Sequence, residues 1–231
     1  MTRLPNKNRK AKFGKSPANW THKLKGIPCF LIGNAPSLNK VPLEKLENYF
    51  TIGINRSFKK IDTTILLWQD LALWLKEEEN VRKTKAIKYC RYSSSSKKKY
   101  YTFTLADRKY KLPITACTMH GRGSSGAIAF QLAFILGCDP IILVGMDCKN
   151  DKKTGFTDFY GVNPMHRPQT IPNCQEGLRW IRDCKSGRKI INCSKNNIFP
   201  ERLTIEEVIE SFGDIEPQNR EKLTKRLLSE D

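Results

Sequence analysis

The ends of a few short apolar runs constrain the fold of this chain more than any other feature. Residues 30–32 are apolar and end in Gly33-Asn34, and residues 141–144 are apolar and end in Gly145-Met146-Asp147. Short apolar runs bounded by turn residues are typical of strands buried in a parallel sheet. Small residues after such a strand leave backbone N–H groups open to a phosphate or a ribose. We therefore expect an α/β protein that holds a nucleotide at this edge of its sheet.

Strand-like and helix-like segments alternate along most of the chain, which predicts a mostly parallel sheet with helices on both faces. The helix over 71–83 is expected to bury Leu71, Trp74 and Leu75, and the helix over 204–212 starts with a capping box of Thr204 and Glu207. We expect strands over 29–32, 50–54, 63–68, 86–92, 141–144 and 189–193, a hairpin over 100–105 and 110–114, and helices over 42–48, 71–83, 125–136, 174–184, 204–212 and 218–228.

The length of 231 residues suits one α/β domain, which we place at residues 27–212. Residues 1–26 carry eight Lys and Arg and no acidic residue, and this predicts a basic, flexible arm. The segment from about 148 to 172 lacks periodicity, and so long a loop is usually functional, so we predict a mobile lid there. Residues 213–231 are predicted to form a charged helix or tail.

A formal net charge of +18 predicts a polyanionic partner or an anionic substrate. A second basic block, residues 80–111, has tyrosines interleaved at Tyr92, Tyr100, Tyr101 and Tyr110. Such blocks grip phosphates and stack on bases, so nucleic acid or another polyanion is a candidate partner. The alternative is a solvated loop and a disordered tail. The sequence does not indicate an oligomeric state.

Targeting signals and paired cysteines are both missing from the sequence. No apolar run approaches the ~20 residues of a membrane span, and the N-terminal residues lack the apolar core of a secretory signal. None of the eight cysteines forms a CxxC pair, so we expect free thiols and no zinc site. Cys29 and Cys138 lie in apolar patterns and are expected to be buried. The predicted location is cytoplasmic.

Polar residues fall where the predicted strands end or a helix begins. Gly33 would let a ligand approach the backbone, and the amides of Asn34 and Asn55 suit a ribose or a base. A phosphate is favoured at the start of the helix over 125–136, where the helix dipole is positive. The predicted nucleotide- or donor-binding residues are Gly33, Asn34, Ala35, Ser37, Asn55, Asp70, Ser124, Ser125, Gly126 and Asp147.

Some other chemistries are disfavoured by what the sequence lacks. A dinucleotide dehydrogenase is not expected, because the first predicted strand runs into Gly33-Asn34-Ala35 and not into a GxGxxG fingerprint. The Asp-x-Asp signature of many metal-dependent sugar transferases is also missing, and we expect no required metal. Asp70 and Asp147 remain possible magnesium ligands. The favoured interpretation of Asp147 is a carboxylate that positions a neighbouring loop.

His166 is a candidate general base because it lies in the predicted lid and histidine titrates near neutral pH. From there it would reach over the nucleotide and take a proton from an acceptor hydroxyl. The alternative is a surface histidine of the loop.

Four segments resemble bacterial sialyltransferases of glycosyltransferase family 42, and equally the group described as 6-hydroxymethylpterin diphosphokinase MptE-like, which is found in bacteria and phages. The similarity covers roughly residues 27–210, and its most specific part ends at Asp147. The matching segments are Ile32–Leu38 (IGNAPSL), Ile54–Arg56 (INR), Ser124–Asp147 (SSGAIAFQLAFILGCDPIILVGMD) and Lys189–Ser194 (KIINCS). Ala35 departs from the pattern, because the family usually has glycine there.

The resemblance implies a single Rossmann-like domain under a mobile lid. It implies that Asn34 and Asn55 contact the nucleotide and that residues 124–126 hold the donor phosphate or sugar. A histidine after the Gly-x-Asp strand would be the general base, which maps to His166. Tyrosines nearby would stabilise the leaving phosphate, which maps to Tyr160.

The predicted function is a metal-independent glycosyltransferase that uses a nucleotide-activated donor. His166 would take the acceptor proton, and Arg167 or Tyr160 would offset the charge on the departing phosphate. The basic blocks suggest an anionic acceptor, such as modified DNA. The first alternative is a diphosphokinase that needs Mg²⁺ at Asp70 or Asp147. The second is a nucleic-acid-binding protein on an inactive scaffold.

Overall fold

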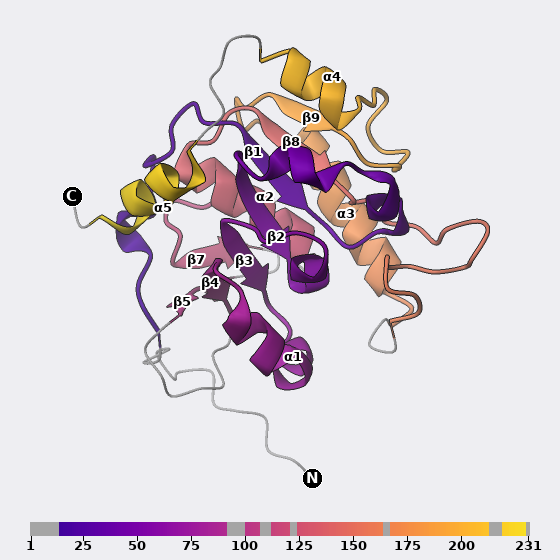
Figure 1. Cartoon of the computed structure of the whole chain (residues 1–231), viewed down its shortest axis with the longest axis horizontal. Coiled ribbons are helices and arrows are strands. Elements are labelled where there is room, and N and C mark those ends of the chain that lie inside the picture. The colour runs from indigo at the N-terminus through magenta and orange to yellow at the C-terminus, as the bar shows by residue number, and fades with distance from the viewer. Residues whose placement is uncertain are drawn as a thin grey trace.

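The computed structural model describes residues 14–91, 100–106, 112–120, 124–163, 167–212 and 219–229. At its centre lies a seven-stranded sheet in the order β5-β4-β3-β2-β1-β8-β9, and every strand pairing in it is parallel (Figure 1). The predicted α/β fold with a mostly parallel sheet is confirmed. The strands are β1 (Cys29–Ile32), β2 (Phe50–Ile54), β3 (Ile65–Trp68), β4 (Ile87–Cys90), β5 (Tyr101–Thr102), β8 (Ile141–Val144) and β9 (Ile190–Asn192).

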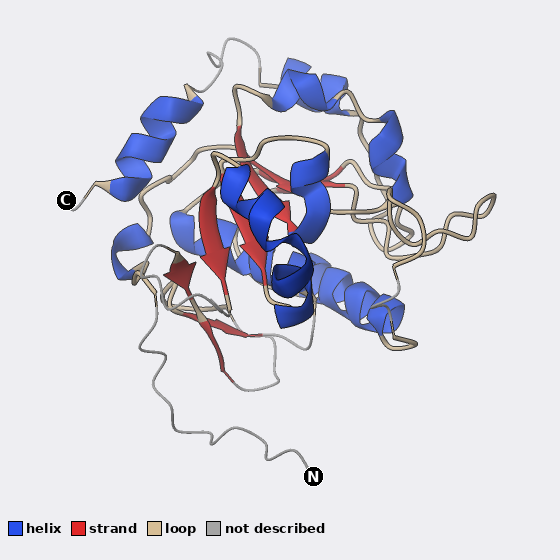
Figure 2. Ribbon diagram, turned by 60° about the horizontal axis from the view of Figure 1, so that its bottom comes forward, coloured by secondary structure: helices blue, strands red, loops and turns tan. Residues whose placement is uncertain are grey.

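Helices cover both faces of this sheet, as predicted (Figure 2). Side chains alternate along β1, so Cys29 and Leu31 face one side while Phe30 and Ile32 face the other. The first side is covered by α2 (Ser125–Leu136), α3 (Thr170–Asp183) and α5 (Arg220–Leu228). The second is covered by α1 (Leu71–Lys83), α4 (Ile205–Glu210) and the 3₁₀ helices η2 (Pro36–Lys40) and η3 (Leu43–Leu46).

Local sequence signals set several boundaries. β1, β2, β8, α1 and α2 have the predicted bounds. Gly137 ends α2 in a left-handed conformation, and the predicted capping box of Thr204 and Glu207 starts α4. Cys29 and Cys138 are fully buried, and all eight cysteines are free. The helix predicted over 42–48 is the shorter η3.

The predicted buried face of α1 is confirmed at Trp74 and wrong at Leu71 and Leu75. These two leucines are 45% and 66% exposed, and Leu73, Glu77 and Val81 join Trp74 on the buried face. Trp74 stacks on Trp68 of β3, with the ring centroids 5.5 Å apart. Because that stacking fixes the rotation of α1 about its axis, Leu71 and Leu75 face the solvent.

The predicted hairpin is also wrong. β5 adds to the main sheet beside β4, and β6 (Thr104–Ala106) pairs in parallel with β7 (Thr118–His120). Residues 92–99 and 107–111 of the second basic block lie outside the described residues, and Tyr92 and Tyr110 lie there too.

Of the four interleaved tyrosines named above, the structure describes Tyr100 and Tyr101, and both pack in the core. Tyr101 packs against Trp20 with the ring centroids 4.5 Å apart, and Tyr100 packs edge-on against Trp68 and Trp74. Their rings are therefore engaged in the protein and not presented together for base stacking.

The predicted flexible arm is wrong for residues 14–26. Trp20 and Leu24 are fully buried in the main core, and Lys15 forms a bridge with Tyr101 beside β5. Because these residues complete the core, the folded part of the chain includes residues 14–26, whereas residues 1–13 lie outside the described residues. None of the described helices combines the length and apolarity that crossing a membrane requires.

Candidate functional site

The chain segments that leave β1 and β8 run together at the carboxyl edge of the sheet. The backbone N–H of Gly33 donates to the carbonyl of Val144 at 2.8 Å, and that of Ala35 donates to the carbonyl of Gly145 at 2.9 Å. A Cβ on Gly33 would overlap the backbone carbonyl of Gly145. Residue 33 must therefore be glycine because the chain directly after β8 passes so close to it. The sequence analysis gave a different reason, namely that glycine would let a ligand approach the backbone.

Two buried amide oxygens lie at the ends of the neighbouring strands β1 and β2. The Nδ2 of Asn34 donates to the carbonyl of Ile54 at 2.9 Å, which fixes the side chain against the start of the next segment. The Oδ1 atoms of Asn34 and Asn55 are buried and have no hydrogen-bond partner among the described residues. Asn55 has a φ of 53°, a left-handed conformation that asparagine tolerates better than most residues. Buried acceptors without partners are costly, so the pair requires donors from elsewhere.

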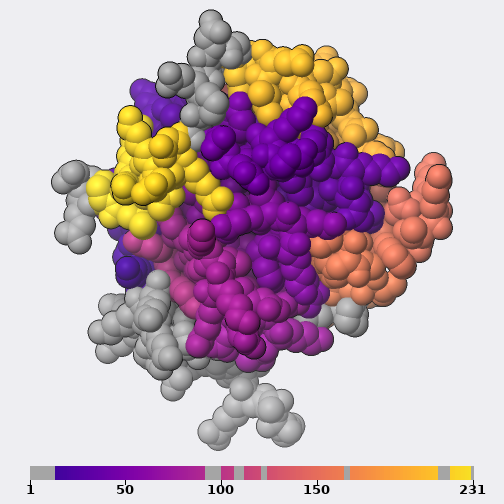
Figure 3. Space-filling model, in the orientation of Figure 1, coloured from indigo at the N-terminus to yellow at the C-terminus, as the bar shows by residue number. Residues whose placement is uncertain are grey.

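The segment of residues 148–163, here called the lid segment, is seated on these strand ends. The N–H of Phe159 donates to the carbonyl of Asn34 at 2.7 Å, and the Nδ2 of Asn39 donates to the carbonyl of Phe159 at 3.4 Å. The Nζ of Lys60 lies 5.4 Å from the centre of the Phe159 ring. In Figure 3 the lid segment lies at the right-hand edge, beside the violet chain that follows β1 and β2.

Arg56 connects the lid segment to α1. Its Nε donates to the carboxylate of Glu77 at 2.7 Å, and its guanidinium carbon lies 4.9 Å from the centre of the Tyr160 ring. Arg56 and Glu77 are both buried, and Lys59 donates to the same carboxylate at 2.8 Å. In the sequence Arg56 stood out only as part of the INR match, because its partners lie far along the chain.

The surroundings keep the Tyr160 phenol protonated. Burial raises its pKa, the charge of Asp158 raises it further, and together they outweigh the opposite effect of Arg56, so the pKa reaches about 12. The Nδ2 of Asn163 donates to the phenol oxygen at 3.1 Å. At neutral pH the phenol therefore keeps its proton and is able to donate it in a hydrogen bond.

Ser37 and Asp147 are partners. The hydroxyl of Ser37 donates to a carboxylate oxygen of Asp147 at 2.7 Å, and the N–H of Lys195 donates to the same oxygen at 2.8 Å. Asp147 is buried and ties η2 to the segment after β9. This geometry agrees with a carboxylate that positions loops, the interpretation that the sequence favoured.

The start of α2 faces the end of β3. The hydroxyl of Ser124 accepts a hydrogen bond from the N–H of Ala127 as the helix cap, and the hydroxyl of Ser125 accepts one from the Nε2 of Gln69 at 3.0 Å. Gln69 is buried, and sequence reasoning missed it. A Cβ on Gly126 would overlap the terminal methyl of Met146. Asp70 is exposed at the position before α1.

The structure describes two of the three predicted catalytic residues, and they differ in their surroundings. Tyr160 lies at the strand ends, beside Arg56. Arg167 is exposed near the start of α3, where its N–H donates to the hydroxyl of Thr170. His166 lies outside the described residues. Within the described ranges, no group of three or more His, Cys, Asp or Glu side chains is arranged to hold a metal ion.

Comparison with known proteins links this fold to glycosyltransferases. No family model and no curated protein sequence matches the chain. Among solved structures, the MAf glycosyltransferase from Magnetospirillum magneticum AMB-1 matches 91% of this chain with a TM-score of 0.52 and 14% identity. The chain spans 41% of the length of that protein.

A second group of similar structures is the sialyltransferase CstII from Campylobacter jejuni. Its structure with cytidine-5'-monophosphate matches 78% of this chain and 82% of CstII, with a TM-score of 0.44 and 12% identity. Its structure with the substrate analogue CMP-3FNeuAc matches 72% of this chain and 80% of CstII, with a TM-score of 0.40 and 11% identity. The structural neighbours are thus glycosyltransferases at low identity, and the match to the MAf glycosyltransferase, with its TM-score of 0.52, supports the Rossmann-like fold.

Proposed function

We propose that this protein transfers a sugar from a nucleotide-activated donor to an acceptor hydroxyl. The observation that carries the proposal is the pair of unpartnered amide oxygens of Asn34 and Asn55, buried at adjacent strand ends. Both are hydrogen-bond acceptors, so they suit a ligand that offers hydroxyl or amino hydrogens, as the ribose and base of a nucleotide do. Ligands of open α/β sheets bind at this edge.

Arg56 and Tyr160 supply what a departing nucleotide phosphate needs. In the proposed reaction the acceptor oxygen forms a bond to the sugar carbon while the bond from that carbon to the phosphate oxygen breaks. Negative charge grows on the phosphate, and the neighbouring guanidinium and protonated phenol would stabilise it. His166 would take the acceptor proton, a role that stays a prediction.

A thermal-shift measurement tests donor binding. CMP and CMP-activated sugars are the first probes, followed by other nucleotides, each with and without EDTA. We expect a pyrimidine nucleotide to raise the melting temperature with EDTA present. Lack of a shift with every nucleotide and nucleotide sugar would refute the proposal.

Asn55→Gly is the matched variant for this measurement. Glycine keeps the left-handed backbone and removes the amide, so the fold should survive. We expect at least a tenfold loss of CMP affinity, since the variant removes one of the two unpartnered acceptors. Equal affinity in Asn55→Gly and wild type would contradict the assignment of this residue. His166→Ala should lose transfer activity and retain nucleotide binding.

The diphosphokinase alternative predicts binding of ATP only with magnesium. Asp147 already accepts two hydrogen bonds, from Ser37 and Lys195, which leaves exposed Asp70 as the more accessible of the two candidate ligands. A melting-temperature shift with ATP and Mg²⁺ that EDTA abolishes would favour this alternative over sugar transfer. Salt-sensitive nucleic-acid binding with no nucleotide affinity would favour the inactive-scaffold alternative.

A further inference from the structure

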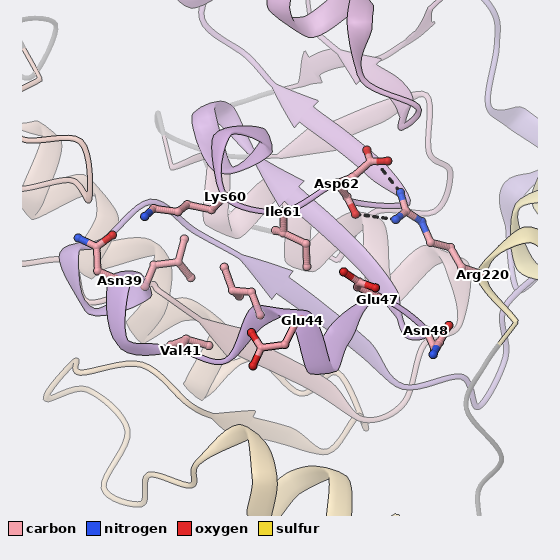
Figure 4. A pocket seen from close by; sticks show the side chains of 11 residues that line it. Asn39, Val41, Glu44, Glu47, Asn48, Lys60, Ile61, Asp62 and Arg220 are labelled. Atoms are coloured by element: carbon pink, nitrogen blue, oxygen red, sulfur yellow. Dashed lines mark hydrogen bonds and ion pairs between the residues drawn. The ribbon is translucent and has the colours of Figure 1, made fainter.

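A groove of about 660 Å³ lies on the sheet face that η2 and η3 cover (Figure 4). One wall is the chain from Leu38 to Asn48, and the other is formed by residues 60–62 together with Arg220 of α5. Its volume lies within the range of about 300–1,000 Å³ that is usual for small-ligand sites. The predicted nucleotide contacts lie outside it, at the ends of β1 and β2, so this groove is a separate feature.

One end of the groove adjoins the nucleotide site. Asn39 and Lys60 line that end, and both contact Phe159: the Nδ2 of Asn39 donates to its carbonyl, and the Nζ of Lys60 lies over its ring. Phe159 in turn donates to the carbonyl of Asn34 and precedes Tyr160. A ligand in the groove would therefore have one end at the lid segment, beside the proposed site of transfer.

The far part of the groove is acidic in a chain whose net charge is +18. Glu44 and Glu47 lie one turn apart on and just after η3, both are exposed, and no ion pair joins either to another described residue. Asp62 is compensated, because Arg220 lies 3.6 Å from its carboxylate and donates to its backbone carbonyl at 2.6 Å. Lys60 lies at the other end of the groove, so the lining holds three carboxylates against the two cations Lys60 and Arg220 and keeps a net charge of −1, with the negative charge concentrated at the two glutamates.

The remaining lining suits a polyhydroxyl molecule. Asn39 and Asn48 offer amides that donate and accept hydrogen bonds, and carboxylates accept from hydroxyls. Between them Val41 and Ile61 provide apolar surface, against which the C–H face of a sugar ring packs. Two carboxylates without a partner attract a cationic group, and an ammonium is the cation that a sugar can carry.

We propose that this groove binds the acceptor and that the acceptor is an amino sugar or a similar polyhydroxyl molecule with an ammonium group. The acceptor assignment rests on the proposed function, whereas the binding site does not. The ammonium would lie between Glu44 and Glu47, and a hydroxyl at the other end would lie at Phe159, next to Tyr160. The proposal differs from the anionic acceptor expected from net charge, because the local charge of the groove is opposite to that of the chain.

Isothermal titration of the full chain with glucosamine and N-acetylglucosamine tests the proposal. The two sugars differ at the amine, which is protonated in glucosamine at slightly acidic pH and is an uncharged acetamide in N-acetylglucosamine. We expect glucosamine to bind at least tenfold more tightly. Glu44→Gln/Glu47→Gln should abolish that preference, and Glu210→Gln, which changes an exposed acid outside the groove, should keep it. Equal affinities of the wild type for the two sugars, or a preference that survives the double variant, would overturn the proposal.

CMP binding, measured in the same preparations, separates this proposal from the proposed function. CMP binding without a glucosamine preference overturns the acceptor site and leaves the donor site intact. A glutamate-dependent glucosamine preference supports the groove as an amine-binding site. If no nucleotide binds in that case, the transferase proposal fails and the site stands. Because both glutamates are exposed, the double variant should melt at the wild-type temperature.

Discussion

Arg56 and Glu77 form a buried ion pair, with Nε and Oε1 2.7 Å apart, at the junction of β2 and α1. Lys59 and Asn80 also donate to this carboxylate group. Burial by itself would raise the pKa of Glu77, but the hydrogen bonds from Lys59, Asn80 and Arg56 lower it below its ordinary value. The other side of the guanidinium meets Tyr160, so α1 holds the cation that the lid segment contacts.

Glu77→Ala should destabilise the protein by about 3 kcal/mol, because it leaves the Arg56 charge buried without its partner. Urea unfolding measures the change, and Glu79→Ala on the exposed side of the same helix should stay close to wild type. The folded protein lowers the pKa of Glu77, so the ionised carboxylate contributes fully to the free energy of unfolding above the ordinary pKa of 4.5. That contribution is lost as the pH falls through the lowered pKa of the folded protein. Equal effects of the two variants would show that the buried pair adds no stability.

Arg56→Lys should weaken CMP binding at least tenfold although it keeps the charge. Lysine lacks the planar group that lies over Tyr160 and cannot at the same time hold Glu77 as arginine does. Lys59→Arg, a change of similar size at the exposed neighbour, is the control and should bind CMP as wild type does. Wild-type affinity in Arg56→Lys would remove Arg56 from the proposed phosphate site.

The parts of the fold that were predictable are those that depend on local pattern. Each of these signals is recognised from a few neighbouring residues: the apolar runs, the glycine after α2 and the Thr204–Glu207 capping box. The corresponding boundaries agree with the structure. The rotation of α1 was not predictable in this way. It depends on Trp68 of the preceding strand and on Arg56, whose positions relative to the helix are set only by the assembled sheet.

The candidate site, too, was predictable only where local sequence pattern was sufficient. Strand-end residues such as Asn34 and Asn55 were identifiable because the ends of parallel strands share one edge. Arg56 and Gln69 were missed, because each is polar, buried and held by a partner distant in sequence. The groove at Glu44 and Glu47 was missed because its walls are two separate crossovers and a helix more than 150 residues further on.

Gly33→Ala should destabilise the protein more than Gly126→Ala. At residue 33 the added methyl would meet the backbone of Gly145, which the neighbouring strand holds in place, and the overlap should cost about 1–3 kcal/mol. At residue 126 it would meet the flexible end of Met146, which is able to move aside. Thermal and urea unfolding of both variants give the comparison. A larger loss in Gly126→Ala would contradict this account of the close approach.

Tyr160→Phe should make stability less sensitive to alkaline pH. Below the ordinary pKa of about 10 the phenol is protonated in the folded and unfolded chains alike, so pH has no effect through this residue. Between about 10 and 12 the unfolded chain releases the proton while the folded protein retains it, so the wild type loses stability as the pH rises through this window. Phenylalanine cannot titrate, and the variant should therefore lose less stability across the window.

The measurement compares the free energy of unfolding at about pH 8 with that at about pH 11 for both proteins. At the lower pH the variant should be slightly less stable, by about 1 kcal/mol, since it loses the hydrogen bond from Asn163. At the higher pH the difference in the free energy of unfolding between the wild type and Tyr160→Phe should narrow or reverse. The same variant should slow sugar transfer more than it weakens CMP binding, because the phenol is proposed to stabilise charge that grows only as the phosphate departs. A constant gap at both pH values would show that Tyr160 titrates normally and that burial and Asp158 do not raise its pKa.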